Sequence, residues 1–247
     1  MTSTKRFLSL FPERKPIIGM LHCKGADDAD MMERALREIE IYRQNGVDGV
    51  LVETYFGTYH QVEMVLEHLA QRKDAIPYGV NCLNVDAMGF VLAEKYRCDF
   101  IQVDSVGGHL KPRDDESLDA FFDYFRRRTD ACLMGGVRFK YQPVHSGRSV
   151  EEDLKICMGR CDAVCVTQNA TGQATSLRRI KRFRKTVGDF PLVVCAGLTA
   201  DNVCEQLRVA DAGVVGSYFK DTGKDSGDVS AEHVAKFMDC VRALRKE

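Results

Sequence analysis

Two short stretches within residues 190–220 decide the fold: Leu192-Val193-Val194-Cys195-Ala196-Gly197-Leu198-Thr199 and Gly213-Val214-Val215-Gly216-Ser217-Tyr218. Each has the pattern of a buried strand that stops at a glycine, and a helix-like segment separates them. A strand that ends in glycine lets a ligand approach bare backbone. A helix that begins just beyond it offers unpaired N–H groups to an anion. Two such ends on neighbouring parallel strands predict a phosphate-binding site.

The rest of the chain repeats this alternation of strand and helix. Apolar runs bounded by Gly, Pro or Asp predict earlier strands at 15–21, 47–53, 76–82, 99–104, 131–140 and 162–167. Periodic apolar positions predict helices at 27–45, 59–72, 85–96, 116–128, 150–158, 175–187, 200–207 and 230–245. Strict alternation of this kind requires a parallel sheet. Within the fifth strand, Gly135-Gly136 predicts a bend or bulge.

An internal repeat predicts that the sheet closes on itself. Four strands begin in the same way, with an Asp between a helix end and an apolar run: Asp48, Asp99, Asp162 and Asp211. These positions lie 51, 63 and 49 residues apart, so the chain consists of four β-α-β-α units. Eight strands in four similar units favour a closed (β/α)8 TIM barrel over an open doubly wound sheet. We therefore expect residues 1–247 to form one barrel domain, with residues 1–14 as an N-terminal leader that closes the barrel floor.

Composition excludes several functional classes. The formal net charge is −1, so no overall field favours nucleic acid or an anionic membrane. The chain has no apolar run long enough for a membrane span and no signal-peptide core. We therefore expect a cytoplasmic protein with no nucleic-acid or membrane partner, and a homo-oligomer remains an open possibility. The ten cysteines lie mostly in apolar runs and are interpreted as free buried thiols rather than disulfides or metal ligands.

In (β/α)8 barrels the active site lies at the carboxyl ends of the strands, which makes a short list of catalytic candidates. Glu53 and Asp104 end otherwise apolar strands, where partial burial would raise a carboxyl pKa toward the range useful for acid–base chemistry. Two such carboxylates also suit a divalent metal, although the sequence defines no metal site and the cofactor stays unknown. Lys140 is a candidate to stabilise an anion, and His22 a candidate acid or base. For Glu53 the alternative is a structural salt bridge, and for Lys140 it is a side chain that extends to solvent at the barrel rim.

Other polar residues near strand ends predict substrate contacts. Candidates to bind the body of a substrate are Asn81, Arg138, Thr167, Asn169, Thr171 and Gly172. Candidates to bind its phosphate are Gly197, Gly216, Ser217 and Lys220. His109 and His145 lie in loops over the same mouth and are more typical of surface residues. The plain alternative for all of these is a local role in βα turns.

Several motifs, taken together, resemble the BtpA/SgcQ family. They include Lys15-Pro16-Ile17-Ile18-Gly19-Met20-Leu21-His22, Gly79-Val80-Asn81, Ala170-Thr171-Gly172 and Val214-Val215-Gly216-Ser217-Tyr218-Phe219-Lys220. The resemblance implies a barrel like those of ribulose-phosphate-binding enzymes. Around the expected pocket the sequence departs from the family pattern, with Thr54-Tyr55-Phe56-Gly57-Thr58 after the second strand and Gln102-Val103-Asp104 in the fourth. These changes indicate a divergent member.

These observations favour an enzyme that acts on a small phosphorylated sugar or ribosyl compound, by isomerase, lyase or glycosidic-bond chemistry. Two alternatives remain open. One is a non-catalytic assembly or stability factor of the BtpA type, and the other is a sugar-phosphate-binding protein without turnover. Buried, paired carboxylates at the barrel mouth distinguish an enzyme from a scaffold, because a scaffold has no need to bury them.

Overall fold

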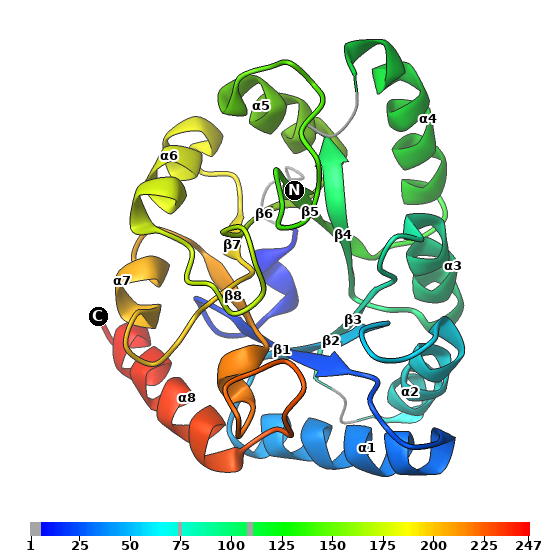
Figure 1. The fold of residues 1–247 in the computed structure, drawn as a ribbon, viewed down its shortest axis with the longest axis vertical. Coiled ribbons are helices and arrows are strands. Elements are labelled where there is room, and N and C mark those ends of the chain that lie inside the picture. The colour runs from blue at the N-terminus through cyan, green and yellow to red at the C-terminus, as the bar shows by residue number, and fades with distance from the viewer. Residues whose placement is uncertain (1–5, 74–75, 108–110) are drawn as a thin grey trace.

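The computed structural model describes residues 6–73, 76–107 and 111–247. Within these ranges eight parallel strands form one closed barrel in sequence order, and helices surround it (Figure 1). The strands are β1 (Ile17–His22), β2 (Gly49–Glu53), β3 (Tyr78–Asn81), β4 (Phe100–Gly107), β5 (Cys132–Val137), β6 (Ala163–Val166), β7 (Leu192–Val194) and β8 (Ala212–Val215). The prediction of a (β/α)8 barrel is confirmed.

Each strand is followed by a helix that packs on the outside of the barrel. The helices are α1 (Asp28–Gln44), α2 (Tyr59–Gln71), α3 (Asp86–Tyr96), α4 (Asp115–Arg126), α5 (Val150–Arg160), α6 (Leu177–Val187), α7 (Val203–Leu207) and α8 (Ala231–Arg245). Capping boxes at Thr58 and Ser149 start α2 and α5, so two helices begin where the sequence supplies a hydroxyl followed by Gln or Glu at the third helical position.

The four repeated aspartates hold the starts of neighbouring strands together. Each stands before an even-numbered strand and accepts the N–H of a residue at the start of the preceding strand. The bonds are Ile17 to Asp48 at 2.7 Å, Tyr78 to Asp99 at 3.0 Å, Leu133 to Asp162 at 2.8 Å and Leu192 to Asp211 at 2.9 Å. A carboxylate that accepts this N–H satisfies a donor that the ladder leaves free. The fourfold repeat is therefore a strand-pairing device.

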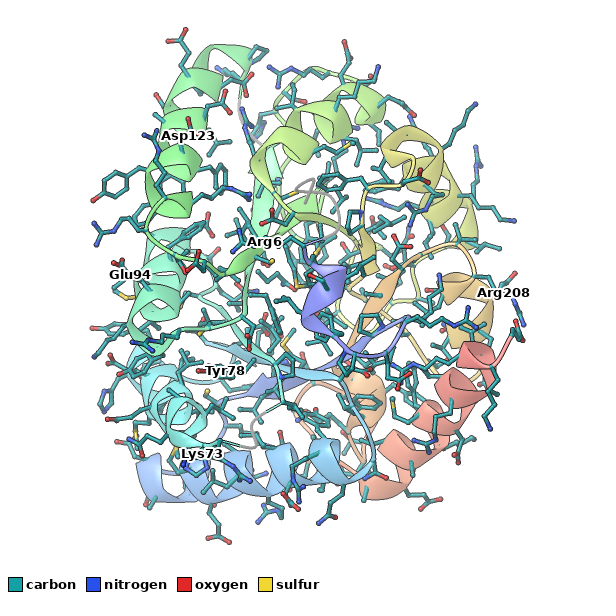
Figure 2. The ribbon with its side chains drawn as sticks, turned by 180° about the vertical axis from the view of Figure 1, so that it is seen from behind. Arg6, Lys73, Tyr78, Glu94, Asp123 and Arg208 are labelled. Atoms are coloured by element: carbon teal, nitrogen blue, oxygen red, sulfur yellow. The ribbon has the colours of Figure 1, made fainter. Side chains whose placement is uncertain are left out.

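The apolar core has two layers. One lies between the strands and the helices, and the other fills the barrel interior with side chains that include Ile18, Leu51 and Met134. Phe7 and Phe11 belong to the inner layer, and the Phe11 ring lies 6.1 Å from that of Phe100. Figure 2 shows the segment near Arg6 across the centre of this end of the barrel, so it closes the floor.

The bulge expected in β5 lies instead in β4. The register pairs Val103 with Gly135 but Gly107 with Val137, so β4 carries extra residues between these points. A Cβ on Gly136 would collide with the carbonyl oxygen of Asp104. Gly135 and Gly136 therefore keep the regular strand register of β5. Because Gly136 has no side chain, the bulged part of β4 can lie close to it. As a result Asp104 lies within the bulge of β4 rather than at the end of the strand.

The ten cysteines are all free thiols, as expected, and eight are buried. In the described part of the chain, helices long and apolar enough to cross a membrane are absent.

Candidate functional site

A cavity of about 250 Å³ opens at the carboxyl ends of the strands. Nine of the residues predicted for the site line it: His22, Glu53, Asp104, Lys140, Thr171, Gly172, Gly197, Gly216 and Ser217. Further lining residues that the sequence did not single out include Tyr55, Asn84, Tyr141, Gln142, Thr199 and Tyr218. Residues from the ends of all eight strands, or from the loops that follow them, therefore converge on one space.

Two carboxylates share one amide at the centre of this site. The Nδ2 of Asn81 lies 3.0 Å from Oε1 of Glu53 and 3.1 Å from Oδ1 of Asp104, and donates to both. Asn81 is 1% exposed, and Glu53 is 7% exposed. Asn81 was expected to touch substrate, but it lies behind the two carboxylates and fixes their positions.

The surroundings of Asp104 change the acidity of its carboxyl group. Burial raises its pKa above the ordinary value, and the nearby Glu53 charge raises it further. Hydrogen bonds from Asn81 and Gln102 and the charge of Lys140 act in the opposite direction. A buried carboxyl group beside a second carboxylate is the usual arrangement for one that holds a proton near neutral pH.

A third acid, Asp86, extends the group and was not among the predicted site residues. It is the first residue of α3, and burial together with the charge of Asp104 raises its pKa to about 6. A helix N-terminus favours a carboxylate, which makes Asp86 look like an ordinary cap in the sequence. Its proximity to Asp104 arises only in the folded barrel, and the sequence alone does not show it.

His22 lies beside these carboxyl groups. Its Nδ1 lies 3.2 Å from the carbonyl oxygen of Asp225, which can only accept, so Nδ1 carries a proton. Its Nε2 lies 3.4 Å from Oε2 of Glu53. A proton on either atom would make this contact a hydrogen bond. The two side chains therefore lie close enough to exchange a proton at the cavity wall.

Lys140 lies in the loop after β5 rather than at the end of that strand. Arg138 has a φ of +48°, which ends the extended conformation at Val137. The Lys140 N–H donates to Oγ1 of Thr167 at 2.8 Å, and Thr167 is fully buried. Thr167 therefore supports the Lys140 backbone, and among the described lysines and arginines only Lys140 lines the cavity.

Arg138, predicted to bind the body of the substrate, does not line the cavity. Its Nε donates to Oδ2 of the buried Asp153 at 2.8 Å, and its Nη2 donates to the carbonyl of Arg148. The reversed φ turns its side chain toward α5, where it holds the long β5 loop. Asn169 does not line the cavity either. Its N–H donates to Oε1 of Gln173 within the loop after β6.

The glycines expected at the phosphate end lie around one side of the cavity. The Cβ of a side chain on Gly172 would lie 3.6 Å from Oγ of Ser217, so the loops after β6 and β8 face each other. Gly197 has a φ of +67° and packs against the backbone of Ala174. These two features require a glycine at this position whether or not a ligand binds there. A Cβ on Gly216 would meet only Met20 and His22 atoms within 4 Å, none nearer than 3.5 Å, so its backbone is accessible from the cavity.

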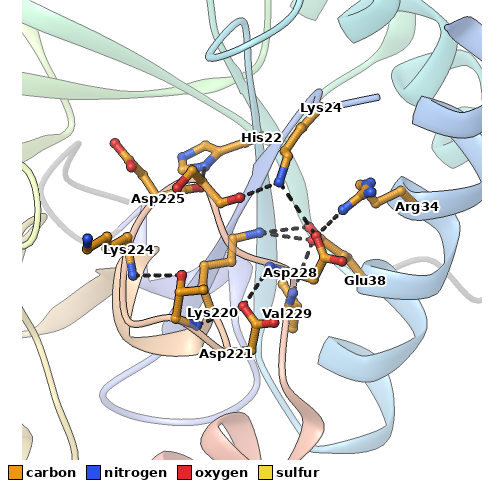
Figure 3. Close-up of polar contacts among 12 residues, drawn as sticks. His22, Lys24, Arg34, Glu38, Lys220, Asp221, Lys224, Asp225, Asp228 and Val229 are labelled. Carbon is orange, nitrogen blue, oxygen red and sulfur yellow. Dashed lines mark hydrogen bonds and ion pairs between the residues drawn. The ribbon is translucent and has the colours of Figure 1, made fainter. Parts of the chain in front are cut away.

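Lys220, the fourth residue expected to bind phosphate, lies outside the cavity, and this prediction is wrong. Its Nζ contacts both carboxylate oxygens of Glu38 at 3.0 Å, and the residue is 1% exposed (Figure 3). Burial lowers the pKa of Lys220, while the Glu38 charge raises it. The ion pair joins the end of β8 to α1 and therefore has a structural role.

The loop that follows Lys220 crosses the barrel mouth. Residues 221–228 lie between the antiparallel bridge partners Lys220 and Val229 and reach the side chains of β1 and α1 (Figure 3). Arg34 and Lys24 pair with Asp228 of this loop, Lys24 at 3.8 Å. Asp225 accepts from His22 through its carbonyl and from Tyr55 through its carboxylate, the latter at 2.8 Å. We name residues 221–228 the mouth loop.

Within residues 6–73, 76–107 and 111–247, no group of three or more His, Cys, Asp or Glu is arranged to hold a metal ion. Of the two loop histidines, His145 lies in the loop after β5 and is exposed, and His109 lies outside the described residues.

The fold and site define a (β/α)8 barrel with buried carboxyl groups and a histidine at its mouth. The chain matches the family described as BtpA over residues 124–243. It is 24% identical to the sgc region protein SgcQ of Escherichia coli, over 94% of this chain and 96% of that one. An uncharacterized protein of Thermococcus kodakarensis is 28% identical, over 95% of this chain and 98% of that one. The resemblance to the BtpA/SgcQ family is confirmed.

Solved structures with the same fold include sugar-phosphate enzymes. An archaeal fructose 1,6-bisphosphate aldolase has a TM-score of 0.62 at 13% identity, covering 98% of this chain and 100% of that one. Phosphoribosyl anthranilate isomerase from Thermococcus kodakaraensis has a TM-score of 0.60 at 17% identity, covering 92% and 99%. At these identities the likeness shows the fold alone.

Proposed function

We propose that this protein is an enzyme that acts on a small phosphorylated sugar or ribosyl compound, through proton transfer in isomerase, lyase or glycosidic-bond chemistry. One observation carries the proposal. Glu53 and Asp104 lie in one cavity wall, joined by a single Asn81 amide, with the pKa of Asp104 raised. A carboxyl group with a raised pKa beside a second carboxyl group can supply an acid and a base within one site.

The two sides of the cavity would have different roles. Gly172, Gly216 and Ser217 offer backbone and a hydroxyl group on the side of β6 and β8, where a phosphate would be held. Glu53, Asp104 and His22 lie on the side of β1, β2 and β4, where protons would move. Lys140 would balance negative charge that develops on the substrate. The aldolase and isomerase that share the fold support this substrate class.

The non-catalytic alternative is less favoured on energetic grounds. A carboxyl group with a raised pKa lowers the free energy of unfolding at neutral pH, because the folded state must ionise a group that prefers to stay protonated. Asp104 and Asp86 both have this property. A scaffold has no reason to keep two such acids together, whereas proton transfer requires them.

The test combines binding with proton exchange. Ribose 5-phosphate and other pentose phosphates are titrated by calorimetry, and exchange of substrate hydrogens with D2O is followed by NMR. We expect binding, exchange in the wild-type protein, and loss of exchange with binding retained in Asp104→Asn. Ser217→Asp should abolish binding because it adds negative charge at the phosphate side. Gln71→Asp, at the exposed C-terminal end of α2, is the charge control.

Three outcomes are decisive. Binding of no pentose phosphate, or equal binding by Ser217→Asp, contradicts the substrate class. Binding without exchange, isomerisation or cleavage of any compound favours a binding protein over an enzyme.

A further inference from the structure

The rim of the cavity carries aromatic rings that the acid–base chemistry does not use. Tyr55 follows β2 and Tyr141 follows β5, and both line the cavity. Tyr141 is 69% exposed and Phe56, beside Tyr55, is 54% exposed. Large aromatic side chains normally gain free energy by burial, so the exposure of these two rings requires an explanation.

The backbone at these aromatic residues is strained. Phe56 has a φ of +67° and Tyr141 a φ of +62°. Bulky residues are rare in this left-handed region, and such strain concentrates at ligand-binding sites, where the surrounding structure maintains it. With this backbone the Tyr141 ring lines the cavity, and the Phe56 ring packs edge-on against Tyr55 with ring centroids 4.7 Å apart.

The two tyrosine rings are also fixed at their far ends. The Oη of Tyr141 accepts the N–H of Thr171 at 2.9 Å, so the ring spans from the β5 loop to the β6 loop. The Oη of Tyr55 donates to Asp225 at 2.8 Å, and the Tyr55 ring packs on His22 with centroids 4.9 Å apart. Each ring is therefore held in one orientation by its polar tip.

A fixed and accessible ring is a preorganised stacking surface. It binds flat partners with little loss of conformational entropy, because the ordering has already taken place on folding. It accepts a broad range of partners, since every planar heterocycle has a π-face. Exposed aliphatic side chains would not provide such a flat and fixed stacking face.

We propose that the Tyr141 and Tyr55 rim binds a planar unsaturated ring, such as a nucleobase or another heterocycle, carried by the phosphorylated substrate. The inference rests on the proposed function and specifies its substrate class. The cavity of about 250 Å³ is smaller than most ligand sites, so it suits the sugar phosphate alone. The ring then lies outside it, on the rim.

The experiment compares four compounds with ribose 5-phosphate by calorimetry: adenosine 5′-monophosphate, cytidine 5′-monophosphate, nicotinamide mononucleotide and, as a ring without phosphate, adenosine. We expect at least one of the three phosphorylated ring-bearing compounds to bind tenfold or more tightly than ribose 5-phosphate. Tyr141→Gly, which relieves the backbone strain, should weaken the binding of that compound tenfold or more. It should weaken the binding of ribose 5-phosphate less than threefold. Tyr141→Ala is the second variant, and both are checked for folding by circular dichroism. Tyr124→Ala, which removes a 57% exposed ring on α4, is the control.

Each outcome decides a separate question. If ribose 5-phosphate binds as tightly as every ring-bearing compound, or Tyr141→Gly weakens all compounds equally, the ring site is overturned and the proposed function stands. If adenosine binds and ribose 5-phosphate does not, the ring site stands and the phosphate-based function fails. If none of these compounds binds, both are overturned.

Discussion

The hydroxyl group of Tyr55 donates a 2.8 Å hydrogen bond to Oδ2 of Asp225, and this bond joins the loop after β2 to the mouth loop. It is also the largest cause of the raised pKa of Tyr55, which reaches about 12. The same Asp225 accepts from His22 through its backbone carbonyl. One residue therefore sets the orientation of both a candidate acid–base group and a rim aromatic.

Replacement of Asp225 should release Tyr55. In Asp225→Ala we expect the pKa of Tyr55 to fall from about 12 toward the ordinary value of about 10, because its acceptor is gone. The measurement is the ultraviolet titration of tyrosinate, with the Tyr55→Phe protein subtracted to isolate this residue. Lys224→Ala, also in the mouth loop, is the control. An unchanged titration in Asp225→Ala would show that the bond does not persist in solution.

The contribution of Asn81 to the free energy of unfolding should increase as the pH rises. In Asn81→Ala both carboxylates lose a donor, and the pKa of Asp104 rises further because the Asn81 hydrogen bond lowers it. A carboxyl group with a raised folded-state pKa loses stability as the pH increases through that pKa. Urea unfolding should therefore show a loss of about 1–3 kcal/mol at pH 8 and a smaller loss at pH 5.

The control for that experiment is Asn45→Ala. Its Nδ2 donates to the carbonyl of Ile41 at the end of α1, away from any carboxylate pair. The loss of unfolding free energy in Asn45→Ala should be the same at pH 5 and at pH 8. Equal costs at both pH values for Asn81→Ala as well would rule out a charge-based role for Asn81.

The barrel was predictable because its signals are local. An Asp before an apolar run marks a strand start wherever it occurs, and Asp48 and Asp162 make the same bond to neighbouring strands. The exact strand ends were less predictable. A β4 that continues to Gly107 depends on pairing with β5 across the bulge, which is a tertiary property.

The site was predictable where a side chain is placed by strand geometry alone. Glu53 follows an apolar run and has to face the barrel end, whereas Arg138 and Lys220 lie beyond strand ends. Their side-chain directions depend on a positive φ in one case and on the buried acid Glu38 in the other. Asp225 lies over the mouth only because the mouth loop folds back, and no local pattern reveals this.

Gly136 should be required for the position of Asp104. In Gly136→Ala the new Cβ would collide with the Asp104 carbonyl oxygen, so the bulge has to shift. We expect a loss of about 1–3 kcal/mol in urea unfolding and a loss of proton exchange on the substrate. Gly159→Ala is a matched control, because its Cβ meets nothing within 4 Å on α5 and a helical alanine is favourable. Full exchange activity in Gly136→Ala would contradict this role of the bulge.

Asp86 should destabilise the protein at neutral pH. Its folded-state pKa of about 6 lies above the reference value of 3.8, so the folded state binds the proton more tightly than the unfolded state. Stability from this group is fully present below the reference value and is lost as the pH rises through the folded-state value. Asp86→Asn should therefore gain about 1–2 kcal/mol at pH 7, allowing for solvent screening, and little at pH 4.

Thermal unfolding from pH 4 to pH 7 measures this gain. Asp201→Asn, at an exposed position before α7, should change the melting temperature little at any pH. A gain for Asp86→Asn that is equal at pH 4 and pH 7 would point to helix propensity instead of a proton.

The Lys220–Glu38 pair should affect stability without affecting ligand binding. Lys220→Met leaves Glu38 buried with the Val229 N–H as a donor at 3.2 Å, and removal of one partner from a buried pair costs about 3–5 kcal/mol. The double variant Lys220→Met/Glu38→Gln removes the uncompensated charge and keeps an acceptor for Val229, so it should recover most of that loss. Urea unfolding of the three proteins measures the recovery. In the double variant, affinity for ribose 5-phosphate should stay within threefold of wild type, since Lys220 lies outside the cavity. A loss of affinity of tenfold or more would instead indicate that Lys220 takes part in phosphate binding.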